Sequence, residues 1–291
     1  MIDKAVIPLA GRGSRMRPVG NVVPKGLFPL PGDDESVRAV FHWILLEAAS
    51  AGVAAAGVVV SPDRGELFER YLAALPTRDR AALPRVQWIV QPTPAGLGDA
   101  LACAHAFTGE DPFLLMLGDH IHSSPPGQPT AAAQILTAFA AHNPAAMIGV
   151  HEIGPADLAH MGVCRGEPFY QGSRESQESH GSPDSHGSLF RCTAFAEKPD
   201  LATAQRDLVT PGLPPDRFLA HAGLYAFTPE IYRHISSLRP AAGERELATA
   251  QSALLAAHPA DYLLARVTGA IWDVGNPAGY RAACAAALRH P

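Results

Sequence analysis

Alternation between two kinds of apolar segment constrains the fold of this chain more than any other feature. Short apolar runs rich in β-branched residues, typical of buried strands, take turns with longer segments whose apolar residues have helical spacing. In the first half, we expect strands at 4–11, 54–62, 86–91, 112–120 and 145–153, and helices at 37–53, 66–75, 98–107 and 131–142. This order predicts an α/β fold with a mostly parallel, Rossmann-like sheet flanked by helices.

The second half has a less regular order and predicts a smaller β-rich part. We expect strands at 161–167, 189–199, 221–227 and two within 261–275, and helices at 229–238, 244–258 and 276–290. Residues 171–189 are rich in Ser, Gly and His and almost lack apolar side chains, which predicts a flexible insertion. Because no repeat or clear linker is present, we predict one domain over residues 1–291.

Composition excludes several classes of protein. The net charge of −5 argues against a general nucleic-acid-binding surface. No apolar run is long enough to cross a bilayer, and the sequence opens directly with a strand instead of a signal peptide. The four cysteines are far apart and form no CxxC pair, which fits a reducing compartment. We therefore expect a cytoplasmic protein without nucleic-acid or membrane partners.

The turn after the first predicted strand has the features of an anion site. Gly11 and Gly13 permit close approaches that a Cβ would block, and free N–H groups there can hold phosphate oxygens. Ser14 adds a hydroxyl donor, while Arg15 and Lys25 add positive charge. An ordinary tight turn with surface arginines is the alternative. Lys25 favours the anion site, since it lies among prolines and apolar residues.

Two familiar phosphate-binding motifs do not match this turn. The P-loop pattern GxxxxGK[ST] is absent, and the dinucleotide fingerprint GxGxxG would need a glycine where Met16 stands. With no Tyr-x-x-x-Lys pair either, a nicotinamide-dependent dehydrogenase is disfavoured.

Two aspartates that follow apolar runs are candidate metal ligands. Asp119 ends "FLLMLGD" and Asp273 lies in "IWDVG", so two distant carboxylates could share Mg²⁺, which prefers oxygen ligands and bridges to phosphates. A simple cap or turn is the alternative for each acid. His120 and His122 follow the first aspartate, and "DHIH" therefore raises a transition-metal site as a second alternative.

A third charged pair, Glu197 and Lys198 in "AEKPD", follows a predicted strand. Lys198 could bind a second phosphate while Glu197 accepts hydrogen bonds from hydroxyls. A solvated charge pair at a strand end is the alternative, and the motif alone favours it.

Taken in order, these motifs resemble those of the sugar-1-phosphate nucleotidyltransferases, and within them the bacterial UTP–glucose-1-phosphate uridylyltransferases. The matching stretches span nearly the whole chain: "KAVIPLAGRGSRMRP…VPKGLFPL", "QPTPAGLGDALACAH", "PFLLMLGDHI", "MGVCRGE", "FAEKP", "HAGLYAF" and "IWDVGNPAGYRAA". The resemblance implies transfer of uridylyl from UTP to glucose 1-phosphate, with Mg²⁺ as cofactor, a sugar-binding role for the β-rich part and a homo-oligomeric assembly.

The resemblance also implies residue roles. The catalytic cations would be Arg15, Lys25 and Lys198, and the Mg²⁺ ligands would be Asp119 and Asp273. The nucleotide would lie against Ala10, Gly11, Gly13, Ser14, Gln91, Gly96 and Gly98. The sugar phosphate would lie against Gly162, Glu197, Lys198 and Gly223.

The chain departs from the family pattern at several points, and these leave the substrate pair open. Asn21 replaces a usual lysine, Gly26 and Thr249 replace usual acids, and "ESVRAV" at 35–40 replaces a "KPL" segment. Another triphosphate such as dTTP, another sugar phosphate, or a non-catalytic homologue that binds nucleotide sugar are therefore the alternatives.

Overall fold

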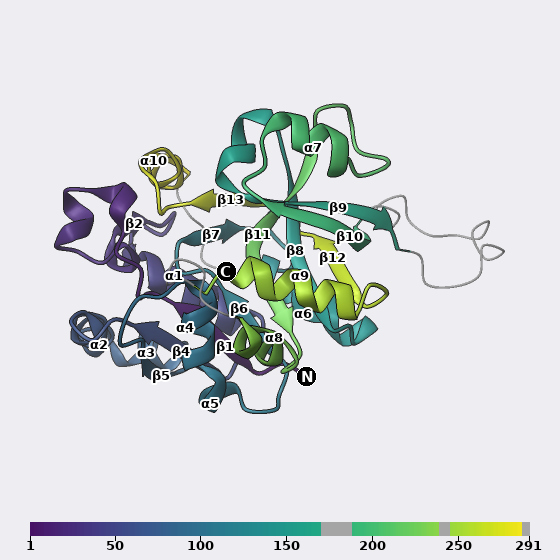
Figure 1. Ribbon diagram of the computed structural model, residues 1–291. Coiled ribbons are helices and arrows are strands. Elements are labelled where there is room, and N and C mark those ends of the chain that lie inside the picture. Colours follow the sequence, from purple (N-terminus) through teal and green to yellow (C-terminus); the bar gives the residue numbers. More distant parts are fainter. Residues whose placement is uncertain (170–187, 239–244, 287–291) are drawn as a thin grey trace.

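The computed structural model describes residues 1–169, 188–238 and 245–286 (Figure 1). The large sheet is built from β1 (Lys4–Pro8), β4 (Ala55–Val60), β5 (Arg85–Val90), β6 (Phe113–Met116), β8 (Ala146–Ile153), β9 (Gly162–Pro168), β10 (Leu189–Glu197), β11 (Phe218–Phe227) and β12 (Tyr262–Arg266). Their order across the sheet is β5-β4-β1-β6-β11-β8-β12-β10-β9. Two small antiparallel sheets pair β2 (Pro29–Pro31) with β3 (Val37–Ala39), and β7 (His120–Ser123) with β13 (Ala270–Asp273).

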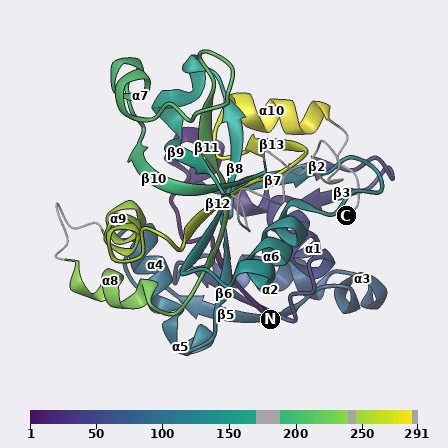
Figure 2. The same ribbon diagram turned by 90° about the vertical axis from the view of Figure 1, so that its right-hand side faces the viewer.

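Helices cover both faces of the large sheet (Figure 2). The α-helices are α1 (Val40–Ser50), α2 (Gly65–Ala73), α3 (Thr77–Ala81), α4 (Leu97–Cys103), α5 (His105–Thr108), α6 (Ala131–His142), α7 (Leu201–Asp207), α8 (Ile231–Ser237), α9 (Leu247–Ala257) and α10 (Pro277–Ala285). Short 3₁₀ turns are η1 (Ser14–Met16), η2 (Val19–Asn21), η3 (Lys25–Leu27) and η4 (Pro155–His160). Helices α1 and α6 share one apolar cluster with the sheet, while α4, α8 and α9 share another.

The central strand β1 shows why its sequence is continuously apolar. Successive side chains of a strand point to opposite faces, so Ile7 packs into the cluster of α1 and Val6 into that of α4. Both side chains are almost fully buried. Each such burial contributes about 1.5–3 kcal/mol, so the strand that positions the glycine turn is anchored from both sides.

The predicted fold class is confirmed, with the parallel part concentrated in the first half. Strands β5, β4, β1 and β6 are parallel neighbours. Strand β11 then runs antiparallel to β6 and β8, and β10 runs antiparallel to β9 and β12. The antiparallel β9–β10 pair belongs to the predicted β-rich part. The sheet takes strands from both halves of the chain, and the boundary of a single domain at 1–291 stays a prediction.

Three element predictions were wrong in detail. The strand expected over 112–120 ends at Met116, and a turn separates it from β7. The helix expected over 37–53 begins only at Val40, because residues 37–39 pair with β2 as a strand. The helix expected over 98–107 is divided into α4 and α5 at Ala104. The predicted insertion at 171–189 falls almost entirely outside the described residues. Among the helices that the structure describes, none has the length and apolar character needed to span a membrane.

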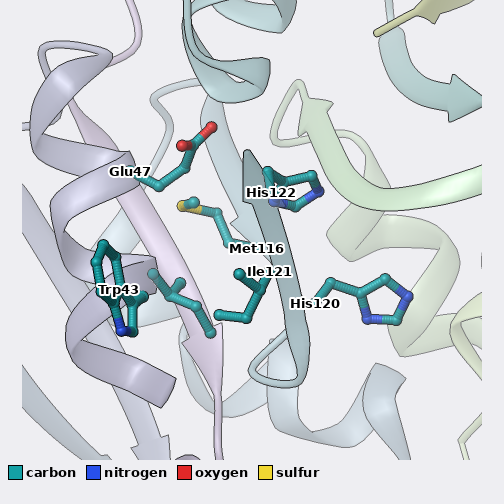
Figure 3. A pocket seen from close by; sticks show the side chains of 7 residues that line it. Trp43, Glu47, Met116, His120, Ile121 and His122 are labelled. Carbon is teal, nitrogen blue, oxygen red and sulfur yellow. The ribbon is translucent and has the colours of Figure 1, made fainter. Parts of the chain in front are cut away.

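A buried glutamate joins α1 to α6 behind β7. Glu47 is 6% exposed, and its Oε1 accepts the Ala132 N–H at 2.7 Å in the first turn of α6. Burial raises the pKa of Glu47 to about 7, although the N–H groups of Ala132 and Ala131 favour the carboxylate. Glu47, Trp43 and His122 are among the residues lining a cavity of about 10 Å³ (Figure 3), close to the smallest space that holds one water.

Candidate active site

The glycine turn lies between β1 and η1. Gly13 has φ 63°, a left-handed conformation that glycine adopts without the strain of a Cβ, and its carbonyl accepts the Met16 N–H at 2.9 Å. In the part of the chain that the structure describes, the N–H groups of residues 11–13 donate to no other protein group. Gly11 and Ser14 are exposed. The turn therefore presents free donors to solvent, as an anion site requires.

Asp119 and Asp273 converge although they are far apart in the sequence. Asp119 lies in the turn between β6 and β7, and Asp273 ends β13. The antiparallel β7–β13 pairing sets His120 opposite Asp273, and the Val274 N–H donates to the Asp119 carbonyl at 2.8 Å. One ligand atom from each of Asp119, His120 and Asp273 lies within 4.8 Å of the other two.

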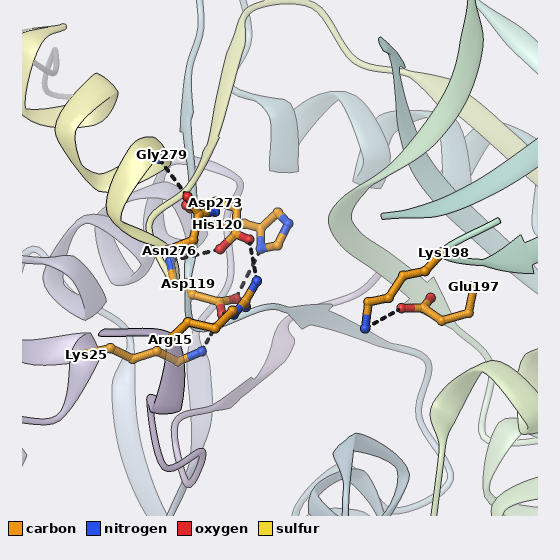
Figure 4. Close-up of polar contacts among 10 residues, drawn as sticks. Arg15, Lys25, Asp119, His120, Glu197, Lys198, Asp273, Asn276 and Gly279 are labelled. Atoms are coloured by element: carbon orange, nitrogen blue, oxygen red, sulfur yellow. Dashed lines mark hydrogen bonds and ion pairs between the residues drawn. The ribbon is translucent and has the colours of Figure 1, made fainter. Parts of the chain in front are cut away.

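Two cations from the N-terminal segment contact these carboxylates (Figure 4). Lys25 Nζ forms an ion pair with Asp119 Oδ2. Arg15 Nη1 donates to Asp273 Oδ2 at 3.2 Å, while its Nη2 lies 3.8 Å from Asp119 Oδ2. Burial alone would raise the pKa of Asp119, but Lys25 and His120 outweigh it and hold that pKa well below its usual range. The carboxylate is therefore ionised at neutral pH.

Gly275 gives the two carboxylates their room. A Cβ at this position would stand 2.6 Å from Asp119 Oδ2 and 2.9 Å from Asp273 Oδ1, closer than real Cβ contacts allow. The Gly275 N–H also donates to Asp273 Oδ1 at 2.8 Å, which fixes that side chain. The Asp273 carbonyl accepts the Asn276 side-chain amide at 3.0 Å, and Asn276 in turn caps α10.

Comparison with known proteins decides the family. The model of the nucleotidyl transferase family matches residues 4–290. The chain belongs to this family. A Bacillus subtilis relative is 30% identical over 257 residues, covering 84% of this chain and 81% of that protein. A UTP–glucose-1-phosphate uridylyltransferase of Mycoplasma genitalium is 25% identical over 295 residues, covering 96% of this chain and 89% of its own.

Solved structures show the same fold over almost the whole chain. A UDP-glucose pyrophosphorylase complexed with UDP-glucose superposes with a TM-score of 0.79 at 22% identity and covers 98% of both chains. The nucleotidyl transferase fold predicted from the sequence is thus confirmed.

Three of the predicted nucleotide-binding residues of this nucleotidyl transferase, Gln91, Gly96 and Gly98, lie close together. Gln91 is buried, and its Nε2 donates to Asp99 Oδ2 at 2.8 Å and to the Gly96 carbonyl at 3.3 Å. A Cβ on Gly96 or Gly98 would lie 2.7 or 2.8 Å from the Arg245 carbonyl. Close packing against the segment at Arg245 therefore requires glycine at both positions, independently of any contact with a nucleotide.

Three of the four predicted sugar-phosphate residues, Gly162, Glu197 and Lys198, meet at the β9–β10 pair. Gly162 is the strand partner of Glu197, and a Cβ on it would stand 3.0 Å from Glu197 Oε2 and 2.8 Å from His221 Nδ1. Lys198 Nζ lies 3.3 Å from Glu197 Oε1, and both side chains are about half exposed. Figure 4 draws this pair on the opposite side of the site from Lys25.

Gly223, the fourth predicted sugar-phosphate residue, lies on β11 beside His120. Its φ is 76°, and a Cβ there would stand 2.6 Å from His120 Cγ. The glycine therefore makes room for the imidazole beside the carboxylates. Its predicted contact with a sugar stays a prediction.

Sequence reasoning missed three residues of this region. The sequence raises His120 only as part of an alternative site, and it singles out neither Gly275 nor His221. His221 is in fact buried, its Nε2 lies 3.0 Å from Cys164 Sγ, and burial lowers its pKa to about 4. The position of His221 in the apolar "HAGLYAF" run was the available signal.

The residues at which the chain departs from the family pattern differ in how buried they are. Gly26 is buried, and a Cβ there would lie 2.9 Å from Leu9 Cδ2 and 3.0 Å from the Phe68 ring, so no acidic side chain fits. Asn21 and Thr249 are exposed on η2 and α9.

Proposed function

We propose that this nucleotidyl transferase moves a uridylyl group from UTP to glucose 1-phosphate, forming UDP-glucose and pyrophosphate. The observation that carries the proposal is the convergence of two cationic side chains, Arg15 and Lys25, with two carboxylates beside the glycine turn. The names of the relatives support the choice of UTP and glucose 1-phosphate.

The reaction needs charge neutralisation and positioning more than acid–base chemistry. A phosphate oxygen of glucose 1-phosphate attacks the α-phosphorus of UTP, and the bond from that phosphorus to the bridging oxygen of the β-phosphate breaks. The electron pair leaves with pyrophosphate. The attacking oxygen is already ionised at neutral pH, so no general base is required. Preorganised positive groups supply the stabilisation in such transfers.

The chain's own residues divide this work. The free N–H groups of residues 11–13 would bind phosphate oxygens of UTP, and Arg15 and Lys25 would neutralise its negative charge. Lys198, whose side chain is 58% exposed, would bind the phosphate of the sugar. Glu197 would accept hydrogen bonds from sugar hydroxyls beside Gly162.

The donor set around Asp119 suits a divalent cation. Two carboxylates lie together, and Gly275 leaves space beside them where any side chain would clash. Asp119 and Asp273 would hold Mg²⁺, which when bound would neutralise charge on the phosphates. The Mg²⁺ dependence and a homo-oligomeric assembly belong to this proposal.

The test is a matrix of substrates scored by pyrophosphate release. Purified protein is incubated with UTP, dTTP, ATP, CTP or GTP against glucose 1-phosphate and other sugar 1-phosphates, with Mg²⁺ present. We expect UTP with glucose 1-phosphate to give the largest kcat/KM. A larger value for dTTP would move the assignment to a thymidylyltransferase, and UTP binding without any pyrophosphate would indicate a non-catalytic homologue.

The variant Asp119→Asn tests whether this site performs the reaction. We expect kcat to fall at least about 100-fold, a loss typical of removing one transition-state charge contact. Asp111→Asn is the matched control, because Asp111 also pairs with a lysine, Lys4, but lies away from the site. Near-normal turnover in Asp119→Asn would refute the assignment.

A further inference from the structure

The histidine after Asp119 has a setting that the proposed reaction does not use. His120 Nδ1 lies 3.1 Å from Asp119 Oδ1. His120 is also the residue of β7 that pairs with Asp273 on β13. Mg²⁺ takes oxygen ligands, so a Mg²⁺ site at the two aspartates would not need an imidazole at this position.

The imidazole is held in place by the backbone around it. The β7–β13 pairing fixes its Cα opposite that of Asp273. Gly223, at φ 76°, lets the ring approach so closely that any Cβ there would stand 2.6 Å from Cγ and 2.8 Å from Cδ2. Gly275 clears the other side, next to both carboxylates. Because Gly223 and Gly275 lack side chains, the imidazole ring and the two carboxylates can lie close together.

The distance between Nδ1 and Oδ1 fits two ligands of a single ion. Neighbouring ligands of an octahedral ion with bonds of about 2.1 Å stand about 3 Å apart, and the observed separation is 3.1 Å. Imidazole nitrogen suits transition ions such as Fe²⁺, Ni²⁺ and Zn²⁺, whereas carboxylate and water ligands suit Mg²⁺ and Mn²⁺. The donor set of one nitrogen and two carboxylates therefore differs in kind from two carboxylates alone.

We infer that His120 is a third protein ligand, so that Asp119, His120 and Asp273 form a centre that discriminates in favour of a transition ion such as Ni²⁺ or Zn²⁺ over Mg²⁺. The presence of a divalent ion at the two aspartates rests on the proposed function. The inference adds the nitrogen ligand and the metal preference that follows from it. The alternative is that His120 only hydrogen-bonds Asp119 and positions that carboxylate.

Pulsed EPR of Mn²⁺ bound to the untagged protein, in a buffer free of imidazole, detects a directly bonded nitrogen. Spectra are recorded with Mn²⁺ alone and with Mn²⁺ plus UTP. We expect ¹⁴N modulation from one imidazole in the wild type. It should be lost in His120→Asn, whose amide offers oxygen near the position of Nδ1. It should remain in His122→Gln, because His122 Nε2 already lies 2.8 Å from the Ala222 carbonyl.

Metal titrations separate ligation from positioning. We expect His120→Asn to weaken Ni²⁺ binding at least about tenfold, while Mg²⁺ affinity, measured by competition, changes less than about threefold because an oxygen ligand remains. Equal weakening of both metals, absence of ¹⁴N modulation from bound Mn²⁺, or no Mn²⁺ binding in either condition would overturn the inference.

The outcome can be told apart from failure of the proposed function. Pyrophosphate release without a nitrogen signal would remove the third ligand and leave the uridylyl transfer standing. A nitrogen signal from Mn²⁺ alone, without pyrophosphate from any substrate pair, would keep the metal centre and remove the proposed reaction.

Discussion

The buried glutamate of α1 makes the stability of this protein depend on pH in a way that one substitution should remove. Glu47 accepts the Ala132 N–H, and burial raises its pKa from the ordinary 4.5 to about 7. Each unit of pKa corresponds to about 1.4 kcal/mol. The rise from 4.5 to about 7 therefore costs the folded state about 3 kcal/mol once the pH is above both values.

The direction in which stability changes with pH depends on whether the folded or the unfolded chain binds the Glu47 proton more tightly. Below pH 4.5 the carboxyl is protonated in both the folded and the unfolded chain, and its full contribution to stability is present. Between 4.5 and about 7 the unfolded chain loses the proton while the folded chain keeps it, so the free energy of unfolding falls. Above about pH 7 the loss is complete.

Glu47→Gln removes this titration and keeps an oxygen that can accept the Ala132 N–H. Urea unfolding is measured from pH 5 to 8 for the wild type and the variant, and their difference in unfolding free energy is plotted against pH. We expect the variant to gain about 2–3 kcal/mol relative to the wild type over this range. Glu69→Gln on α2, an exposed position, controls for the loss of one acidic charge. A difference that stays constant with pH for Glu47→Gln would refute the reasoning.

Three further substitutions test the site. Lys198→Ala should raise KM for glucose 1-phosphate about 10- to 100-fold, as expected for a lost charged contact, and leave KM for UTP nearly unchanged; equal effects on both would contradict its role. Gly223→Ala should lower turnover more than Gly212→Ala, since both glycines have positive φ but only the Cβ at 223 meets His120; similar losses would contradict that contact. Lys25→Met should tighten Mg²⁺ binding to the substrate-free protein about tenfold, or about 1.4 kcal/mol, in calorimetry, yet lower kcat. Weaker binding would contradict a competition between Lys25 and the metal for Asp119.

The strands, and the positions of the two aspartates after apolar runs, could be predicted because these signals are local. A β-branched run such as 4–8 is buried on both faces, and an acid that follows such a run is delivered to the strand end. That Asp119 and Asp273 share a site followed from the resemblance and the chemistry of Mg²⁺. The antiparallel β7–β13 pair that joins them spans about half the chain, and no local pattern encodes it.

The errors and omissions have the same physical origin. Residues 37–39 (Val, Arg and Ala) carry no local signal that separates them from α1, and only their pairing with β2 makes them a strand. The glycines at 96 and 98 stay predicted nucleotide contacts, and sequence reasoning missed their close protein neighbour, Arg245, which lies far along the sequence. His120 could not be ranked from sequence because its proximity to Asp273 depends on strand register, and its ring position depends on Gly223.

The charges of the site indicate that metal and triphosphate binding depend on each other. In the substrate-free chain, Lys25 and Arg15 neutralise Asp119, and Arg15 also contacts Asp273. A divalent cation held as proposed at these carboxylates would compete with both side chains, and a triphosphate on the glycine turn would compete with the carboxylates for the same two cations. Each ligand would therefore release the groups that the other needs, and by thermodynamic linkage each would raise the affinity for the other by the same factor. Such coupling would keep either ligand from binding strongly alone, so that the site acquires its full set of charges only when both are present.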